Sequence, residues 1–189
     1  MDSHQIIDAL RGSVPDGAVD AAPAGDGMPA IYVAREHAAA VCQALRDDPA
    51  LQFALAVDMT AVDFLPREPR FEVVVHLVSL GIPPYGNTPK RLRVKFRVPG
   101  TDPHMPTLSG VWKAMNWAER EVYDMFGVHF DGHPDLRRIL MPEDWDGHPA
   151  RKDYPVQIKM TPKVYEPLQV TAQEFAANLQ ANRDRAQRD

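Results

Sequence analysis

The sequence predicts an α+β fold, a two-layer domain with a mixed β-sheet and helices packed on it, followed by a long extended C-terminal arm. Residues 91–98 alternate between apolar and basic side chains, as in a strand with one buried face. Residues 35–48 and 116–126 repeat apolar side chains at helical spacing. Residues 127–169 contain six prolines and show neither period, so they favour an extended course. These patterns place the domain at 1–126, the arm at 127–170 and a C-terminal helix at 171–189.

The N-terminal part begins with a short helix and a connector. Ser3 is a suitable N-cap for a helix to Leu10, which carries apolar residues on one face. Residues 13–30 are rich in Pro, Gly and Ala and predict a flexible connector. Residues 31–33 predict a short strand, and the helix at 35–48 must end before Pro49.

Three further strands and two helical segments follow. Residues 53–59 alternate, and residues 71–80 are apolar on nearly both faces, which is typical of a central strand. Residues 107–115 predict a helix that restarts at Asn116, with Glu119 as the acid of a capping box. Gly127 supplies the C-terminal cap of that second helix.

The stretch after Gly127 is too apolar to be a solvated tail and too irregular to build its own core. A structureless run of this length is uncommon inside a compact domain and is usually functional or disordered. Its apolar anchors argue against disorder, so we expect the arm to take its shape from a partner's surface. The terminal helix opens with Thr171 and Glu174, a second capping box.

Composition excludes several classes of function. The 189 residues carry a formal charge of −5, which gives no electrostatic support for binding nucleic acid. The single Cys42 excludes a disulfide framework and an iron–sulfur cluster ligated by this chain alone. The sequence shows no signal peptide and no apolar run long enough to span a bilayer, so we expect a soluble protein that meets a membrane only through partners.

Two repeats of Asp-Gly-His-Pro, at 131–134 and 146–149, raise the hypothesis of a metal-dependent hydrolase using His129, His133 and His148. The spacing does not place these three imidazoles on one helix face. The dipeptides Asp-Gly and His-Pro, which make up each repeat, are also ordinary turn formers. The turn interpretation is therefore favoured. Phosphate-binding glycine loops and a nucleophile elbow are also missing from the sequence.

Charged residues alternate in sign around apolar anchors from residue 119 onward. Arginine pairs with carboxylates through two parallel hydrogen bonds, and buried pairs of this kind confer specificity at interfaces. These residues are the candidate site, for a partner interface or for anchoring the arm: Glu119, Arg120, Glu121, Asp124, Gly127, His133, Pro134, Arg137, Arg138, Arg151, Lys152, Asp153 and Tyr154. We expect no catalytic, cofactor-binding or metal-binding residue in this chain.

Residues 107–156 resemble the 30 kDa subunit of proton-pumping NADH–quinone oxidoreductase, respiratory complex I. The motifs are Glu-Arg-Glu at 119–121, Asp-Met-Phe-Gly at 124–127, Gly-His-Pro-Asp-Leu-Arg-Arg-Ile-Leu at 132–140 and Lys-Asp-Tyr-Pro at 152–155. The resemblance implies a peripheral subunit without a redox centre, on the cytoplasmic side of the membrane. It also implies partners that form the quinone site and bear clusters, with FMN and iron–sulfur clusters in other subunits.

Three alternatives stay open beside this interpretation: the equivalent subunit of a related membrane-bound hydrogenase or ferredoxin-dependent complex, the metal hydrolase, and a free-standing binding module. If the charged residues cross an interface, Arg138→Ala is expected to lower the yield of assembled complex more than it disturbs the isolated fold.

Overall fold

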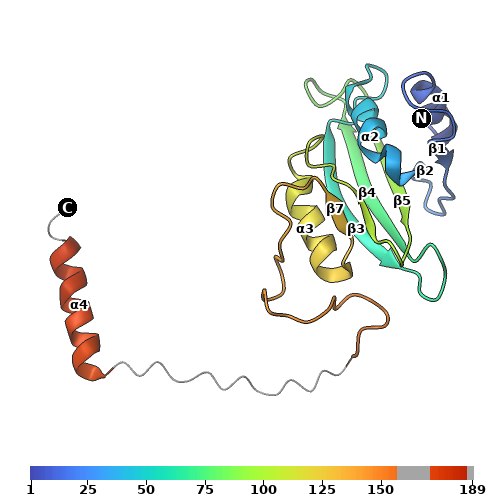
Figure 1. Cartoon of the computed structure of the whole chain (residues 1–189). Helices are drawn as coiled ribbons and strands as arrows, with labels where there is room; N and C mark the ends of the chain where they lie inside the picture. The colour runs from blue at the N-terminus through green and yellow to red at the C-terminus, as the bar shows by residue number, and fades with distance from the viewer. Residues whose placement is uncertain (157–170, 187–189) are drawn as a thin grey trace. The chain divides into compact units, whose positions relative to one another are not determined.

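A mixed five-stranded sheet forms the centre of the compact unit at residues 1–155, in the strand order β1-β2-β5-β4-β3 (Figure 1). Strands β2 and β5 are parallel, and the other neighbours are antiparallel. The computed structural model describes residues 1–156 and 171–186. The elements are α1 (Ser3–Leu10), β1 (Val19–Ala21), β2 (Ala30–Val33), the 3₁₀ helix η1 (Arg35–His37), α2 (Ala38–Asp47), β3 (Leu55–Asp63), β4 (Phe71–Leu80), β5 (Pro89–Val98), β6 (His104–Pro106), α3 (Met115–Phe126), β7 (His129–Asp131) and α4 (Ala172–Ala186).

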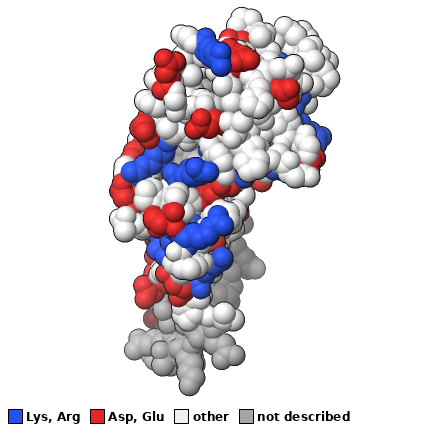
Figure 2. Space-filling model, turned by 90° about the vertical axis from the view of Figure 1, so that its right-hand side faces the viewer, with Lys and Arg blue, Asp and Glu red and all other residues white. Residues whose placement is uncertain are grey.

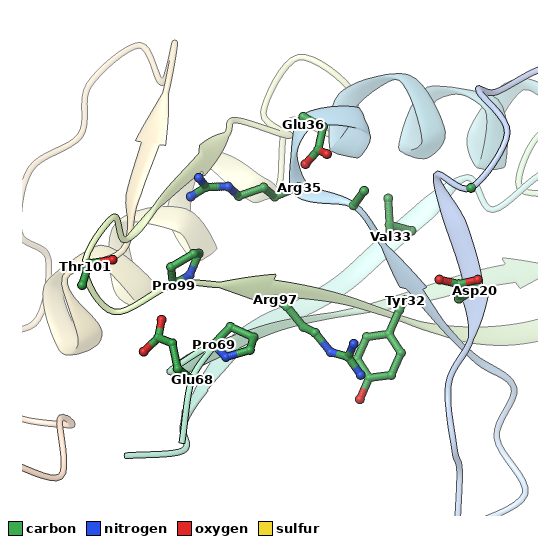
Figure 3. A pocket seen from close by; sticks show the side chains of 12 residues that line it. Asp20, Tyr32, Val33, Arg35, Glu36, Glu68, Pro69, Arg97, Pro99 and Thr101 are labelled. Carbon is green, nitrogen blue, oxygen red and sulfur yellow. The ribbon is translucent and has the colours of Figure 1, made fainter. Parts of the chain in front are cut away.

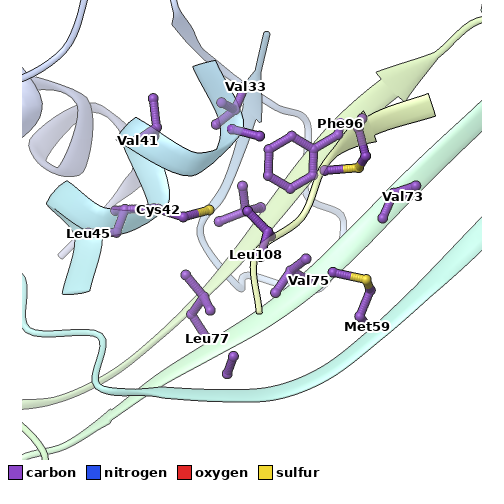
Figure 4. Close-up of a cluster of buried hydrophobic side chains, with 14 of the residues drawn as sticks. Val33, Val41, Cys42, Leu45, Met59, Val73, Val75, Leu77, Phe96 and Leu108 are labelled. Carbon is purple, nitrogen blue, oxygen red and sulfur yellow. The ribbon is translucent and has the colours of Figure 1, made fainter. Parts of the chain in front are cut away.

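One face of the sheet and the helices α1, α2 and α3 share a single hydrophobic core. In Figure 4, Cys42 of α2 points into the buried cluster that also contains Val75 of β4 and Phe96 of β5, and Val41 and Leu45 of α2 are buried in the same cluster. The predicted alternation of residues 91–98 is confirmed, because Leu92, Val94, Phe96 and Val98 are fully buried while the basic residues between them lie on the other face. The predicted α+β class with helices packed on a mixed sheet is therefore confirmed.

The central and edge strands differ in how well the sequence predicted them. Residues 71–80 form β4, which pairs with β3 on one side and β5 on the other, as expected of a central strand. The alternation predicted for residues 53–59 is broken by a register shift between Ala56 and Asp58. This irregularity turns Val57 outward, where its side chain is 63% exposed.

Two N-terminal details correct the prediction. The N-cap of α1 is Asp2, which forms a capping box with Gln5, while the Ser3 hydroxyl accepts a hydrogen bond from the Ala30 amide. The predicted flexible connector at 13–30 contains the strand β1, which pairs antiparallel with β2. A strand of three residues is too short to show a readable period, so its pairing with β2 decides its conformation.

The helix predicted at 107–115 is a series of turns, and α3 begins only at Met115 with no side-chain cap. The apolar residues of this stretch are buried as expected, with Leu108 and Met115 in the core. The Glu119 carboxylate accepts hydrogen bonds from the Leu108 amide and the Thr107 hydroxyl. Glu119 thus caps the preceding turns rather than its own helix.

The expectation that residues 127–170 form an extended arm shaped by a partner is wrong for residues 127–155, which belong to the same compact unit as the sheet. Val128 and Phe130 are buried in the core, and β7 pairs in parallel with β6. Sequence periodicity did not predict this burial, because the apolar side chains of residues 127–155 enter the core one at a time, from turns and from a strand of three residues. The expected course of 157–170 lies outside the described residues.

The C-terminal helix α4 belongs to a second unit. The predicted capping box is confirmed, because the Thr171 hydroxyl accepts a hydrogen bond from the Glu174 amide and the Glu174 carboxylate accepts one from the Thr171 amide. Among residues 1–156 and 171–186, no helix has the length and apolar character needed to cross a membrane.

Candidate partner-binding surface

Asp124 is the hub that holds residues 137–141 against α3. Its fully buried carboxylate accepts hydrogen bonds from the backbone amides of Ile139, Leu140 and Met141 at 2.8–3.0 Å and from Arg138 Nη1 at 2.6 Å. Burial pushes the pKa of this carboxyl up, but the bonds from Met141 and Arg138 outweigh that effect, so the pKa is lowered. Asp124 is therefore a charged anchor with no oxygen left for a partner.

Arg120 and Arg138 complete this attachment from opposite sides. Arg120, one turn before Asp124 on α3, donates to the carbonyls of residues 137 and 138 at 3.1 Å. Arg138 donates in the other direction, to Asp124 and to the carbonyls of Trp145 and Gly147. Both guanidiniums are therefore occupied within their own chain. Arg138→Ala is accordingly expected to loosen this segment itself, which reverses the expectation from the sequence.

Glu119 and His133 form a second buried contact, between α3 and the turn at 133–135, with His133 Nε2 3.9 Å from the Glu119 carboxylate. His133 Nε2 lies 3.0 Å from the Asn116 carbonyl, and Nδ1 accepts a hydrogen bond from the Asp135 amide at 3.0 Å. This pattern assigns the proton to Nε2. Burial raises the pKa of Glu119 to about 7, against the hydrogen bonds from Thr107 and Leu108. Both ring nitrogens of His133 are therefore engaged by backbone groups, so His133 stabilises the turn at 133–135 and has no nitrogen free to bind a ligand.

The end of α3 is closed by residues from the second Asp-Gly-His-Pro turn. Gly127 adopts φ +72°, and Arg151 donates to the Phe126 carbonyl at 2.5 Å. His148 Nδ1 lies 3.0 Å from the carbonyl oxygen of Asp124. A Cβ on Gly127 would come within 2.5 Å of the His148 ring, so a glycine is required here both for φ and for space.

The sequence reasoning missed the pair Asp63 and Arg70, which ties residues 151–154 to the β3–β4 hairpin. Arg70 donates to Asp63 and to Asp153, and the Lys152 amide donates to Asp63. The hydrogen bond from Arg70 lowers the pKa of Asp63. Asp63 and Arg70 lie more than 80 residues from Lys152 and Asp153 in sequence, and neither stands in a motif that could have indicated the contact.

The remaining predicted site residues divide between anchors and exposed groups. The Tyr154 hydroxyl donates to the Asp146 carbonyl, which braces the turn around Gly147. Pro134, the Lys152 side chain and Glu121 are exposed, and Arg137 forms only an exposed ion pair with Asp135. Most of the charged residues marked by sequence thus anchor the segment, and the groups left for a partner are few.

A surface suited to a partner nevertheless lies beside these anchors. Trp117 precedes Arg120 by one turn of α3, and its ring lies 5.0 Å from the Arg120 guanidinium. Leu140 follows on the segment that Asp124 holds. Trp117 and Leu140 are 62% and 59% exposed. We name these two residues the Trp117–Leu140 surface, together with Glu121, which lies one turn after Trp117 on α3, and Arg137, whose carbonyl Arg120 binds. Sequence periodicity did not single out Trp117 because it lies outside the apolar face that residues 118, 122, 125 and 126 form at helical spacing.

The three histidines of the metal hypothesis do not converge. His133 and His148 bind backbone carbonyls of different residues, and His129 lies beside Asp131 at the surface. Among the residues that the structure describes, no group of three His, Cys, Asp or Glu side chains could hold a metal ion. The geometry therefore gives the hydrolase hypothesis no support.

Two hollows lie at the ends of β2 and β5, away from the Trp117–Leu140 surface. The larger, of about 560 Å³, runs from Gly17 and Asp20 past Tyr32 and Arg97 to Thr101 (Figure 3). The smaller, of about 210 Å³, includes Arg67 and shares Tyr32 and Arg97 with it. On the face shown in Figure 2, basic and acidic side chains are interspersed, without a broad patch of one sign.

Comparison with known proteins identifies relatives over most of the chain. Residues 31–159 match the family model described as the 30 kDa subunit of respiratory-chain NADH dehydrogenase. An NADH-quinone oxidoreductase subunit of Roseiflexus sp. (strain RS-1) is 43% identical over 82% of this chain and 86% of the relative. Its counterpart in Geobacter sulfurreducens is 52% identical over 69% of this chain and 76% of the relative.

A solved structure of the membrane-bound sulfane sulfur reductase, an archaeal respiratory membrane complex, contains a chain with the same fold. The TM-score is 0.64 at 21% identity, over 89% of this chain and 97% of the other. At this identity the likeness concerns the fold alone. The family match covers more than half of the chain, and the relatives agree with it. The chain therefore belongs to the family of 30 kDa subunits of respiratory-chain NADH dehydrogenase, as its sequence motifs had indicated.

Proposed function

We propose that this chain is a non-redox subunit of a proton-translocating NADH–quinone oxidoreductase and that it holds the quinone-site subunit in place. FMN and iron–sulfur clusters would reside in other subunits, and the cluster-bearing subunit would be a second neighbour. The chain would sit on the cytoplasmic side of the membrane and reach it only through these partners. Its relatives are subunits of NADH-quinone oxidoreductase, which supports the assignment to such an assembly.

The observation that supports the scaffold role is the hydrogen-bonded attachment of residues 137–141, which carry the exposed Leu140, to α3, which carries the exposed Trp117. Six hydrogen bonds from Arg120, Arg138 and three backbone amides converge at Asp124 and at the carbonyls of residues 137 and 138. They hold Leu140 in a defined position next to α3, which carries Trp117. Large exposed aromatic residues that need no reordering are the usual anchors of protein interfaces.

The test is the double variant Trp117→Ala/Leu140→Ala in the native host. Its urea unfolding midpoint should stay close to that of the wild type, because both side chains are exposed and the contact of Trp117 with Arg120 contributes at most about 0.5–1 kcal/mol. The yield of intact complex on native gels should fall several-fold, since a truncated interface anchor typically costs about 2 kcal/mol or more of binding. Ile82→Ala, a similarly exposed residue between β4 and β5, is the control. Full yield from the double variant would refute a partner role for this surface.

The second candidate is the equivalent subunit of a related membrane-bound hydrogenase or ferredoxin-dependent complex. The likeness in fold to a chain of a different respiratory membrane complex favours keeping it. Mass spectrometry of the co-purifying subunits, with an assay of NADH oxidation by the purified assembly, separates the two. An assembly that contains no NADH-oxidising subunit would favour the second candidate.

A further inference from the structure

The imidazole of His104, at the start of β6, lies between two carboxylates from different parts of the chain. Its Nδ1 is 2.5 Å from Asp131 Oδ2, at the end of β7, and its Nε2 is 3.0 Å from Asp102 Oδ1, in the connection that follows β5. An ionised carboxylate only accepts hydrogen bonds, whereas a neutral imidazole has a single N–H to donate. Both contacts can therefore be hydrogen bonds only when His104 is protonated on both nitrogens.

Arg35, in the 3₁₀ helix η1, holds one of these two carboxylates in place. Its guanidinium donates to Asp102 Oδ2 at 2.6 Å and to the backbone carbonyls of Asp102 and His104 at 2.8 and 3.0 Å. The hydrogen bond from Arg35 lowers the pKa of Asp102, so this carboxyl stays ionised across the neutral range. The hydrogen bond with Asp131 raises the pKa of His104, and the charge of Arg35 opposes that shift without reversing it. The arrangement therefore favours a positive charge on His104.

A second histidine, His129 at the start of β7, faces the same group of charges. Its Nδ1 lies 3.3 Å from the other oxygen of Asp131, and its ring meets the Tyr123 ring of α3 edge-on, with 6.5 Å between the ring centres. Helix α2 also packs against β6. Among residues 1–156 and 171–186, no charged side chain of α2 or α3 forms a hydrogen bond or ion pair with His104. The proton on His104 thus depends on Asp102, Asp131 and Arg35, and His129 acts on it through Asp131.

The contact between His104 and Asp131 bridges two very short strands. Strands β6 and β7 have three residues each and are parallel. At their two ends, the His129 amide donates to the Pro103 carbonyl at 2.8 Å and the Thr107 amide donates to the Asp131 carbonyl at 2.9 Å. A pair of strands this short is marginal without further contacts. Loss of the ion pair should therefore loosen β7 from β6 locally, while the buried side chains of both strands keep the domain folded.

We propose that His104 is a proton-dependent clasp, which holds β7 against β6 while it is protonated and releases this strand pair when it loses its proton at alkaline pH. A histidine whose pKa is higher in the folded state stabilises that state fully below its unfolded value, near 6.5, and this contribution is lost as pH rises through the folded value. Strand β7 runs directly into the turn at 133–135, so the clasp fixes where that turn begins. The proposal is independent of the proposed function, because every group in it belongs to this chain.

The first experiment follows the imidazole protons of the full chain by NMR from about pH 5 to about pH 9, at low salt, because ions screen these partly exposed charges. The titration midpoint of His104 should lie above that of His4, an exposed histidine without an ion pair among the described residues. Asp131→Asn should move the midpoint of His104 down toward that of His4. A midpoint of His104 at or below that of His4, or one that Asp131→Asn leaves unchanged, would overturn the proposal.

The second experiment measures hydrogen exchange at the amides of residues 107 and 129 in the full chain, each corrected for its intrinsic exchange rate at the pH used. The protection of these amides in the wild type should fall several-fold between about pH 6 and about pH 8.5, while that of the β4 amides falls less. His104→Gln should fold, because the side chain of His104 is 42% exposed, and should show low protection at these two amides without the pH dependence.

Two other titrating groups are controlled in this experiment. Glu119, whose pKa is about 7, is present in both the wild type and His104→Gln, so the difference between the two proteins reports on His104. His129→Gln is the matched control, because it removes the other imidazole beside Asp131 and should keep the fall in protection. Constant protection in the wild type, or the same fall in His104→Gln as in the wild type, would overturn the proposal.

Discussion

Replacement of Asp124 by asparagine tests whether this buried carboxylate holds residues 137–141 in place. The carboxylate is fully buried, and one oxygen accepts three backbone N–H groups while the other accepts Arg138 Nη1 at 2.6 Å. Asparagine keeps one oxygen and places an NH₂ group at the other position. Either orientation sets donor against donor, facing Arg138 or facing the three amides.

The expected loss of stability follows from the burial of the pair. The Arg138 side chain is only 14% exposed, so asparagine leaves its charge largely uncompensated. Removing one partner of a buried ion pair costs about 3–5 kcal/mol. A typical domain has only about 5–15 kcal/mol of total stability, so Asp124→Asn is expected to remove a large part of it.

Urea unfolding followed by tryptophan fluorescence measures this loss, and hydrogen exchange at the amides of Ile139, Leu140 and Met141 localises it. Asp135→Asn is the control: its ion pair with Arg137 is exposed and should contribute less than about 1 kcal/mol. Asp124→Asn/Arg138→Gln should lose less than the two single variants summed, because no charge is left unpaired. A loss of stability below about 1 kcal/mol in Asp124→Asn, with unchanged exchange at these amides, would show that the Asp124 carboxylate does not hold residues 137–141 in place.

Three further predictions concern the other anchors. Because burial raises the pKa of Glu119 to about 7 while the unfolded carboxyl titrates near 4.5, the folded state retains a proton that the unfolded state loses. The free energy of unfolding should therefore fall as pH rises from 4.5 to 7, and the urea midpoint should change less with pH in Glu119→Gln than in the wild type. The same pH dependence in both proteins would exclude the effect. Gly127→Ala should cost more than Gly12→Ala, since both have positive φ but only Gly127 has side chains within 2.5 Å of the added Cβ, and equal thermal midpoints would show that space is not limiting. Arg70→Ala should speed hydrogen exchange at the amides of residues 151–154 while leaving those of α2 protected. Unchanged slow exchange at residues 151–154 would mean that Asp63 alone is enough to hold this segment.

The sequence by itself determined the fold class, the core strands and the family. Alternation in β5 and the apolar run of β4 result from burial that any sheet of this kind imposes, so they are readable from local pattern. The motifs between residues 119 and 155 indicated the family because they stand together in order, and the matched family model confirms this. The sequence also indicated Asp124, Arg138 and Arg151 as candidate site residues.

Only the tertiary structure decided what those residues hold. Asp124 binds amides 15 to 17 residues away, and Arg70 binds Asp153 at a separation of 83 residues, distances at which no local period carries information. The strands β1, β6 and β7 have three residues each, so their conformation depends on their pairing partners. Residues 127–155 lack a periodic apolar face, yet single side chains such as Phe130 enter a core built by the rest of the chain. Periodicity reports a repeated environment, whereas a segment fixed by isolated anchors and buried charges has its shape set by contacts that only folding brings together.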